Sequence, residues 1–169
     1  MPGYELIGKE ESKEIKDLFN KSKTLSRMGF DKVRKKIYKV KQFENNFSKF
    51  IKSPYCLAVT SGTAALRIAL ATLGIKKGDE VLTSAFTFVA TVEAIVESGA
   101  QPIIVDIDDT LNISPKDLKK KITKKTKALI VVHMLGVPVE LKEIKKICLK
   151  RKIKIIEDTA WGCGAKYNG

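Results

Sequence analysis

The sequence predicts an α/β domain with a largely parallel sheet, preceded by a helical N-terminal segment. After Tyr55, short apolar runs alternate with segments whose apolar residues recur at helical spacing. Turn residues separate these segments, as in LGIKKGDE at 73–80. Regular alternation of strand and helix is typical of parallel α/β sheets. The chain has 169 residues, which is enough for one domain with a substantial core.

Two charge-rich helices are predicted at the N-terminus, over 12–24 and 34–51, with a loop at LSRMGFD between them. The second helix carries apolar residues at spacings of three and four, which form one stripe along a helix. We therefore assign residues 1–53 to an N-terminal helical segment and residues 54–169 to the α/β domain. The stripe consists of Ile37, Val40, Phe43, Phe47 and Phe50.

Five apolar runs are predicted as strands, with four helices between them. The strands are YCLAV (55–59), EVLTS (80–84), QPIIVD (101–106), KALIVVH (127–133) and IKIIED (153–158). The helices are expected near 63–73, 87–98, 114–122 and 139–150. Ligands of such sheets bind beyond the carboxyl ends of the strands. This rule selects Ser61-Gly62-Thr63 after the first strand, Ser84 to Phe88 after the second, and Asp158 after the last.

The formal net charge of +13 raises the question of nucleic-acid binding. Of the 32 basic residues only 4 are Arg, the residue that usually reads phosphates and bases. The Lys residues are spread over several segments without interleaved aromatic residues. The densest run, PKDLKKKITKKTK at 115–127, is more simply a solvated helix and turn. We therefore expect no nucleic-acid partner.

Cysteine usage and hydropathy indicate a cytoplasmic protein without a membrane partner. Cys56, Cys148 and Cys163 form no Cys-x-x-Cys pair, so we interpret them as reduced thiols. The longest strongly apolar run, ALIVVHML at 128–135, is too short to span a bilayer. The N-terminus, MPGYELIGKEESKE, has no signal-peptide core. No metal site is predicted.

Ser61-Gly62-Thr63 has two interpretations. Gly62 permits a tight strand-to-helix turn, and the helix that follows presents unpaired N–H groups and a positive dipole end that suit a phosphate. Thr63 can add a hydroxyl. The alternative is an ordinary Ser/Thr helix cap. The chain contains neither G-x-G-x-x-G nor a P-loop, so dinucleotide and nucleoside-triphosphate sites are disfavoured.

Two further positions suggest which kind of ligand would carry a phosphate bound at Ser61-Gly62-Thr63. Asp158 ends an apolar strand, where a carboxylate is costly unless paired, and a pyridinium nitrogen would pair with it. Its alternatives are a helix cap and a structural salt bridge. Phe86 and Phe88 stand where an aromatic side chain could stack on a flat ring, although core packing would also explain them. A phosphate cradle, a stacking face and an acid match pyridoxal phosphate better than any nucleotide.

From about Phe43 to the end of the sequence, a series of motifs follows in order: FENNFSKF, SGTAAL, LGIKKGDEVLTSAFTFVATVEAI, SGAQPIIVDID, TLNISPKDL, TKALIVVHMLG and EDTAWGCGAKYNG. In these motifs the sequence resembles the DegT/DnrJ/StrS family of sugar aminotransferases, which have the aspartate-aminotransferase fold, fold type I. The resemblance implies the large domain of that fold, a three-layer α/β/α arrangement with a mostly parallel sheet, truncated before the small C-terminal domain.

The resemblance also implies roles for individual residues. Gly62 and Thr63 would hold the phosphate of pyridoxal 5′-phosphate, and Phe88 would stack on its pyridine ring. Asp158 would pair with the ring nitrogen and keep it protonated. Trp161 stands where the family usually has His or Gln near the phenolic oxygen, and its indole N–H could still donate one hydrogen bond.

The activity that the resemblance implies is transfer of an amino group, from glutamate, to a nucleotide-linked keto-sugar by a homodimeric enzyme of amino-sugar and polysaccharide biosynthesis. The Schiff-base Lys is expected beyond Gly169, in a Ser-Phe-x-x-x-Lys motif, and no Lys of this chain matches that context. We therefore name no catalytic residue and expect the chain alone to be inactive. Lys166 is near the site in sequence but is a poor substitute.

Two alternatives remain open at this point. The chain could be a non-catalytic remnant or partner module, or part of a family dehydratase, in which a His replaces the Schiff-base Lys. His133 is the only His of the chain and ends a predicted strand. The resemblance gives it no acid–base work, so we interpret it as structural or as part of the cofactor's surroundings.

Overall fold

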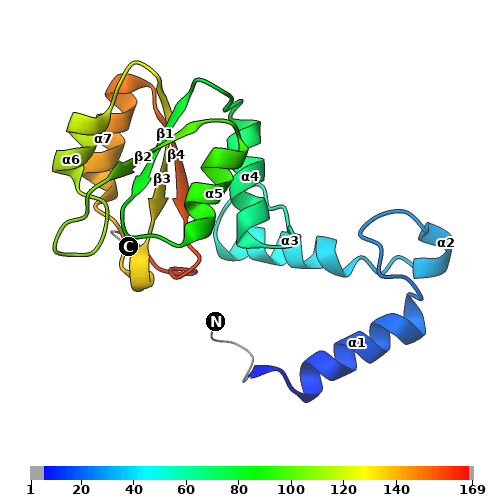
Figure 1. The fold of residues 1–169 in the computed structure, drawn as a ribbon. Helices are drawn as coiled ribbons and strands as arrows, with labels where there is room; N and C mark the ends of the chain where they lie inside the picture. The colour runs from blue at the N-terminus through cyan, green and yellow to red at the C-terminus, as the bar shows by residue number, and fades with distance from the viewer. Residues whose placement is uncertain (1–5, 168–169) are drawn as a thin grey trace. The chain divides into compact units, whose positions relative to one another are not determined.

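A computed structural model describes residues 6–167, and the chain divides into two compact units, Met1–Ala58 and Val59–Gly169. The first unit contains three helices: α1 (Lys9–Lys21), α2 (Asp31–Arg34) and α3 (Lys39–Phe50) (Figure 1). The predicted apolar stripe lies along α3 and the turn before it, and Phe43 and Phe47 stack with ring centroids 5.6 Å apart. No residue of α3 is buried.

The second predicted helix is wrong in extent, because the chain turns after α2 before α3 begins. Lys35 and Lys36 have positive φ angles of 50° and 63°, which interrupt any right-handed helix. The guanidinium of the buried Arg34 donates hydrogen bonds to the carbonyl oxygens of Gly29, at 2.6 Å, and Ser26, at 2.7 Å. These bonds stabilise a compact turn that the apolar spacing alone does not reveal.

The second unit confirms the predicted parallel α/β architecture. Its four strands lie in the order β2-β1-β3-β4, and every neighbouring pair is parallel. The strands are β1 (Glu80–Ser84), β2 (Gln101–Val105), β3 (Thr126–Val132) and β4 (Lys154–Asp158). The helices are α4 (Gly62–Thr72), α5 (Val89–Glu97), α6 (Pro115–Lys121) and α7 (Leu141–Arg151), with a short 3-10 helix at Met134–Gly136.

Helices cover both faces of the sheet, α4 and α5 on one and α6 and α7 on the other, as Figure 1 shows. Side chains alternate between the two faces along each strand. Val81 packs with α4 and α5, whereas the next residue, Leu82, packs with α6 and α7. The same alternation separates Ile130 from Leu129. The three-layer α/β/α arrangement is therefore confirmed.

The first predicted strand, YCLAV at 55–59, is not a strand in the structure. Its composition suits a strand, but no described strand pairs with it, and a strand needs a neighbour to satisfy its backbone. Tyr55 is 86% exposed. The Ala58 N–H donates to the carboxylate of Glu44 at 2.9 Å, so a side chain takes the place of a strand partner.

Two expectations from composition can be compared with the structure. Between residues 6 and 167, no helix has both the length and the hydrophobicity needed to cross a bilayer. All three cysteines are free thiols. Cys148 is buried in α7, and this burial raises the pKa of its thiol to about 11, whereas Cys163 is exposed.

The core of the sheet predicts a large cost for truncating Leu129, which is fully buried in β3 between β1 and β4. We expect Leu129→Ala to lower the free energy of unfolding by about 2–5 kcal/mol, through lost transfer energy and a residual cavity. Urea unfolding followed by circular dichroism measures this. Leu149→Ala is the control, because Leu149 is 77% exposed on α7 and should change stability by less than about 0.5 kcal/mol. Equal losses in the two variants would contradict the packing described.

Candidate functional site

The candidate site is the edge of the sheet where all four strands end. Because the strands are parallel, Ser84, Val105, Val132 and Asp158 finish at this same edge. Helix α5 begins directly beyond β1. Helix α4 ends just before the turn that leads into the amino end of β1, so α4 runs against the strands and its N-terminus points toward the carboxyl edge (Figure 1).

The N-terminus of α4 is both a cap and an open donor site. Ser61 is the N-cap in an extended conformation, and its Oγ accepts from the Ala64 N–H at 3.1 Å. Within the described chain, the N–H groups of Gly62 and Thr63 have no acceptor. A Cβ at Gly62 would meet no atom within 4 Å, so the space over these donors is open. The cap and anion interpretations are therefore compatible, since they use different N–H groups.

Asp158 ends β4 with a carboxylate that is only partly satisfied. Its Oδ1 accepts from the Ala160 N–H at 3.0 Å, which holds the turn beyond the strand. No Lys, Arg or His of the described chain lies within 4 Å of this carboxylate, so the salt-bridge alternative is not observed there. Ile156, two positions earlier on β4, packs with the cluster formed by α4 and α5. Alternation along β4 thus directs the Asp158 side chain to the face covered by α4 and α5.

Phe88 follows β1 at the same edge, as the N-cap residue of α5. Its ring is 70% exposed, so the core-packing alternative does not describe it. Phe86 is partly exposed in the same connection. An exposed aromatic face next to a helix N-terminus is available for stacking on a flat ring.

Trp161 lies in the turn after β4, and its side chain is 52% exposed. The Trp161 carbonyl oxygen would be 3.2 Å from a Cβ at Gly136, a residue with a φ of +82°. Glycine at 136 therefore lets the connection after β3 approach the turn after β4. No described residue accepts a hydrogen bond from the Trp161 indole N–H, which leaves this donor available.

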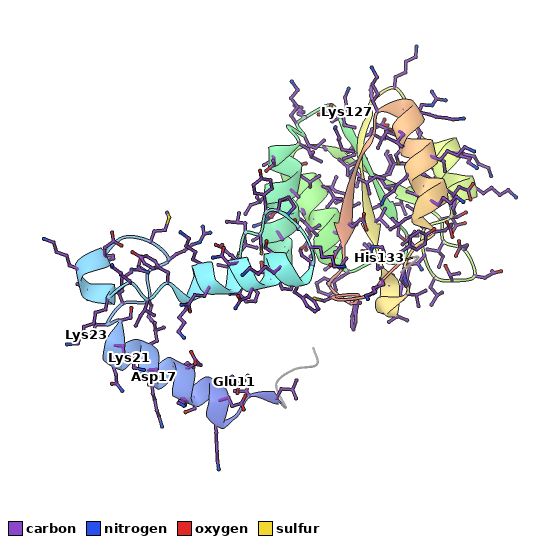
Figure 2. The ribbon with its side chains drawn as sticks, turned by 180° about the vertical axis from the view of Figure 1, so that it is seen from behind. Glu11, Asp17, Lys21, Lys23, Lys127 and His133 are labelled. Atoms are coloured by element: carbon purple, nitrogen blue, oxygen red, sulfur yellow. The ribbon has the colours of Figure 1, made fainter. Side chains whose placement is uncertain are left out.

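His133 connects the ends of β3 and β4, and Figure 2 shows it at the carboxyl edge, opposite Lys127 at the start of β3. It is 5% exposed. Its Nδ1 accepts from the Val139 N–H at 3.1 Å, so the ring proton is on Nε2, which lies 3.3 Å from Glu157 Oε2. The contact is therefore a hydrogen bond from a neutral imidazole. This bond lowers the pKa of Glu157 below its ordinary value of 4.5, against the opposing effect of burial.

The sequence analysis missed Glu157. The only signal available was its position one residue before Asp158 on a strand, which places the two side chains on opposite faces of the sheet. From sequence alone, a glutamate near the end of a strand is expected to be solvated, because its partner is not known. Its partner, His133, is 24 residues away in sequence.

A hollow of about 660 Å³ lies between α6 and α7 and contains none of the predicted site residues. The candidate site is thus an open edge of the sheet and not this hollow. The hollow is lined by Lys119, Ile122, Glu140, Lys142, Glu143, Lys146, Ile147, Lys150 and Arg151.

The groups at the carboxyl edge fit a phosphate-bearing aromatic cation. Two free N–H groups at a helix N-terminus suit a phosphate, and Thr63 adds a hydroxyl. The second oxygen of the Asp158 carboxylate has no partner among residues 6–167, so it is available to a protonated ring nitrogen. Phe88 supplies an exposed ring. This donor set fits pyridoxal phosphate, whose phosphate, pyridinium and flat ring require these three kinds of partner.

The fold and these groups define the large domain of a pyridoxal-phosphate enzyme of the aminotransferase type. The sequence model of the DegT/DnrJ/EryC1/StrS aminotransferase family matches residues 14–169, and the chain belongs to this family. The resemblance predicted from the motifs is therefore confirmed. Solved structures of the family contain pyridoxal phosphate or its amino form.

Three relatives illustrate the similarity. The GDP-perosamine synthase of Escherichia coli O157:H7 is 42% identical over 131 residues, which are 77% of this chain and 36% of that protein. An aminotransferase from Psychrobacter cryohalolentis has a TM-score of 0.87 at 31% identity, over 99% of this chain and 40% of its own. A GDP-4-keto-6-deoxymannose-3-dehydratase with a trapped PLP-glutamate geminal diamine has a TM-score of 0.82 at 34% identity, over 94% and 40%. The chain spans about a third of the length of the curated relatives it matches.

The cap at α4 gives a prediction that needs no ligand. We expect Ser61→Ala to lower the free energy of unfolding by about 1 kcal/mol, because the Ala64 N–H loses its acceptor. Ser61→Asp should retain most of the stability, since aspartate caps helices equally well. Thr60→Ala is the matched control, because Thr60 is exposed and its side chain makes no hydrogen bond within the described part of the chain. A Ser61→Ala variant as stable as Thr60→Ala would show that the cap is unimportant.

Proposed function

We propose that this chain provides the cofactor-binding part of a pyridoxal-phosphate-dependent aminotransferase that acts on a nucleotide-linked keto-sugar. One observation carries the proposal: free N–H donors, an exposed aromatic ring and a half-satisfied carboxylate meet at one edge of a parallel sheet. The GDP-sugar names of the relatives support the substrate class, and the glutamate adduct in the dehydratase structure supports glutamate as the amino donor. Residues 54–169 form the binding part, and residues 1–53 form a helical segment before it.

In this proposal the phosphate is held by backbone and not by lysine. The N–H groups of Gly62 and Thr63 donate to it at the positive end of α4, and the Thr63 hydroxyl adds one further donor. Gly62 keeps the approach free of side-chain atoms. Phe88 stacks on the ring and excludes water from one of its faces.

Asp158 has the electronic role. Its carboxylate keeps a proton on the ring nitrogen, and the Ala160 N–H orients that carboxylate through the other oxygen. The bound cofactor supplies a protonated ring that accepts electrons from a neighbouring carbanion. The indole N–H of Trp161 donates to an oxygen at the ring's edge, where the family more often has a His or Gln.

Cofactor binding by the 169-residue chain tests these roles. We expect saturable, noncovalent binding of pyridoxal phosphate, measured by absorbance and equilibrium dialysis. Asp158→Asn should weaken it roughly tenfold or more, because a hydrogen bond to a charged group is lost. Ser61→Asp should weaken it as well, by repelling the phosphate while the helix stays capped.

Asp109→Asn is the control for the loss of one negative charge, since Asp109 is exposed beyond β2 and its side chain forms no hydrogen bond or ion pair with any residue that the structure describes. It should bind the cofactor as the parent chain does. The roles given to Asp158 and to the α4 N-terminus are contradicted if the parent chain does not bind, or if Asp158→Asn and Asp109→Asn bind equally.

Covalent chemistry is a separate matter, and we infer that the 169-residue chain alone does not transaminate. None of its 28 Lys stands in the Ser-Phe-x-x-x-Lys context that the family uses. Without that Lys a positioned base is missing, and acid–base help alone contributes about a hundred- to ten-thousand-fold in rate. Covalent activation would add to this.

The assay supplies a keto-sugar nucleotide, glutamate and pyridoxal phosphate, and borohydride treatment tests for a covalent adduct. We expect no amino-sugar product and no reduced adduct. Turnover that disappears in Asp158→Ala would contradict this inference. It would direct attention to Lys166, and Lys166→Ala would then be the variant to measure.

A second candidate function is sugar dehydration by an enzyme of the same family. The observation in its favour is the dehydratase structure at 34% identity, which is as similar to this chain as the aminotransferase structures are. Products from a longer polypeptide that includes this chain distinguish the two, because only an aminotransferase leaves nitrogen on the sugar. A non-catalytic module that binds the cofactor weakly is the remaining alternative.

The wider setting belongs to the same proposal. We place the protein in the cytoplasm as a homodimer that makes amino sugars for polysaccharide biosynthesis. Free thiols support the compartment, and the family supports the pathway class. No nucleic-acid or membrane partner is needed for this role.

A further inference from the structure

His133 binds three segments of the chain at once. Its backbone N–H donates to the Asp158 carbonyl oxygen at 3.1 Å, in continuation of the β3–β4 pairing. Its ring accepts from the Val139 N–H on one side and donates to Glu157 on the other. The end of β3, the end of β4 and the connection before α7 are thus joined through one buried side chain.

Because of the strand geometry, the contacts of His133 also restrict Asp158, the residue that follows Glu157. Glu157 and Asp158 are successive residues of β4, so their side chains leave the strand on opposite faces. Glu157 lies on the side of α7, where Lys145 Nζ is 4.0 Å from its Oε1. Holding Glu157 from that side limits rotation of the strand end, and therefore limits the directions open to the Asp158 carboxylate.

The two ring contacts of His133 determine its tautomer and its partner. Nδ1 accepts a hydrogen bond from the Val139 backbone N–H, so the ring proton is on Nε2. The Nε2–H donates to Glu157, the residue adjacent to Asp158.

We propose that His133 is a positioning residue for Asp158, which fixes the carboxylate by clamping Glu157 on the opposite face of β4. This inference rests on the role proposed above for Asp158. It assigns His133 no proton transfer, since its ring nitrogens are both engaged within the chain. The clamp exists in the chain without cofactor, so it can be tested without cofactor.

The test is amide hydrogen exchange of the 169-residue chain by NMR, with the Ala160 N–H as reporter of its bond to Asp158 Oδ1. We expect His133→Phe and Glu157→Ala to speed Ala160 exchange about tenfold, as for loss of a net hydrogen bond. Glu157→Gln should exchange nearly as the parent does, because it keeps an acceptor oxygen for Nε2–H. Glu157 is more exposed than His133, with 38% of its side chain accessible, so we expect its variants to fold even if His133→Phe does not.

Two controls separate positioning from general loosening. The Gly162 N–H, bonded to the Thr159 carbonyl oxygen at 2.9 Å, lies in the same turn, and its exchange should stay unchanged in Glu157→Ala. It is not a control for His133→Phe, because Gly162 lies against the His133 side chain. Leu118→Ala removes a fully buried side chain of α6 and should not speed Ala160 exchange selectively. Equal acceleration of Gly162 and Ala160 in Glu157→Ala, or an unchanged Ala160 in that variant, would overturn the proposal.

Cofactor titration of the same variants keeps this inference distinct from the proposed function. We expect Glu157→Ala to bind pyridoxal phosphate more weakly than Glu157→Gln. If the parent chain binds no cofactor, the proposed function fails, and the exchange rates still decide whether the clamp exists. If the parent binds and Glu157→Ala matches it in both affinity and Ala160 exchange, the positioning role of His133 fails alone.

Discussion

Parallel pairing of four strands is the constraint on which the rest of the second unit depends. It makes every strand end at one edge, so residues from the connections after β1, β3 and β4 approach one another although they are tens of residues apart in sequence. It also forces each connection to return across a face of the sheet, which is why helices form both outer layers. The α4 N-terminus reaches the same edge because that helix runs against β1.

The alternation of side chains along each strand then determines on which face of the sheet each functional side chain lies. The Asp158 side chain lies on the face of the sheet that α4 and α5 cover. The free N–H groups are at the N-terminus of α4, and Phe88 is at the N-terminus of α5. Glu157 belongs to the face of α7 and pairs with His133. Two adjacent carboxylates thus have separate tasks, one open toward a ligand and one engaged within the chain, and a shift of one residue in register would exchange them.

The two outer layers of the second unit differ in charge. Residues 115–154, which include α6 and α7, carry 14 basic and three acidic residues, a formal net charge of +11. All 14 basic side chains are exposed. Residues 59–100, which include α4 and α5, carry a formal net charge of −1. The basic residues of α6 and α7 therefore form a solvated basic surface on the face of the sheet opposite α4.

The sequence by itself determined the elements with strong local signals. The four paired strands, the start of α4 within one residue of its predicted position and the strand-terminal position of Asp158 follow from apolar periodicity, a Ser/Gly boundary and a polar residue after an apolar run. The family motifs added the cofactor and the expected role of Phe88. Each of these signals resides in a few neighbouring residues, so no knowledge of distant partners was needed.

Only the tertiary structure decided the features that depend on a partner elsewhere in the chain. YCLAV has the composition of a strand, but pairing needs a neighbouring strand, and Glu44 bonds to its backbone instead. The break before α3 depends on carbonyl groups that receive the Arg34 guanidinium. His133 acquires its tautomer and its partner from Val139 and Glu157. Hydrogen bonds between segments are set by the folded backbone, and local composition carries no record of them.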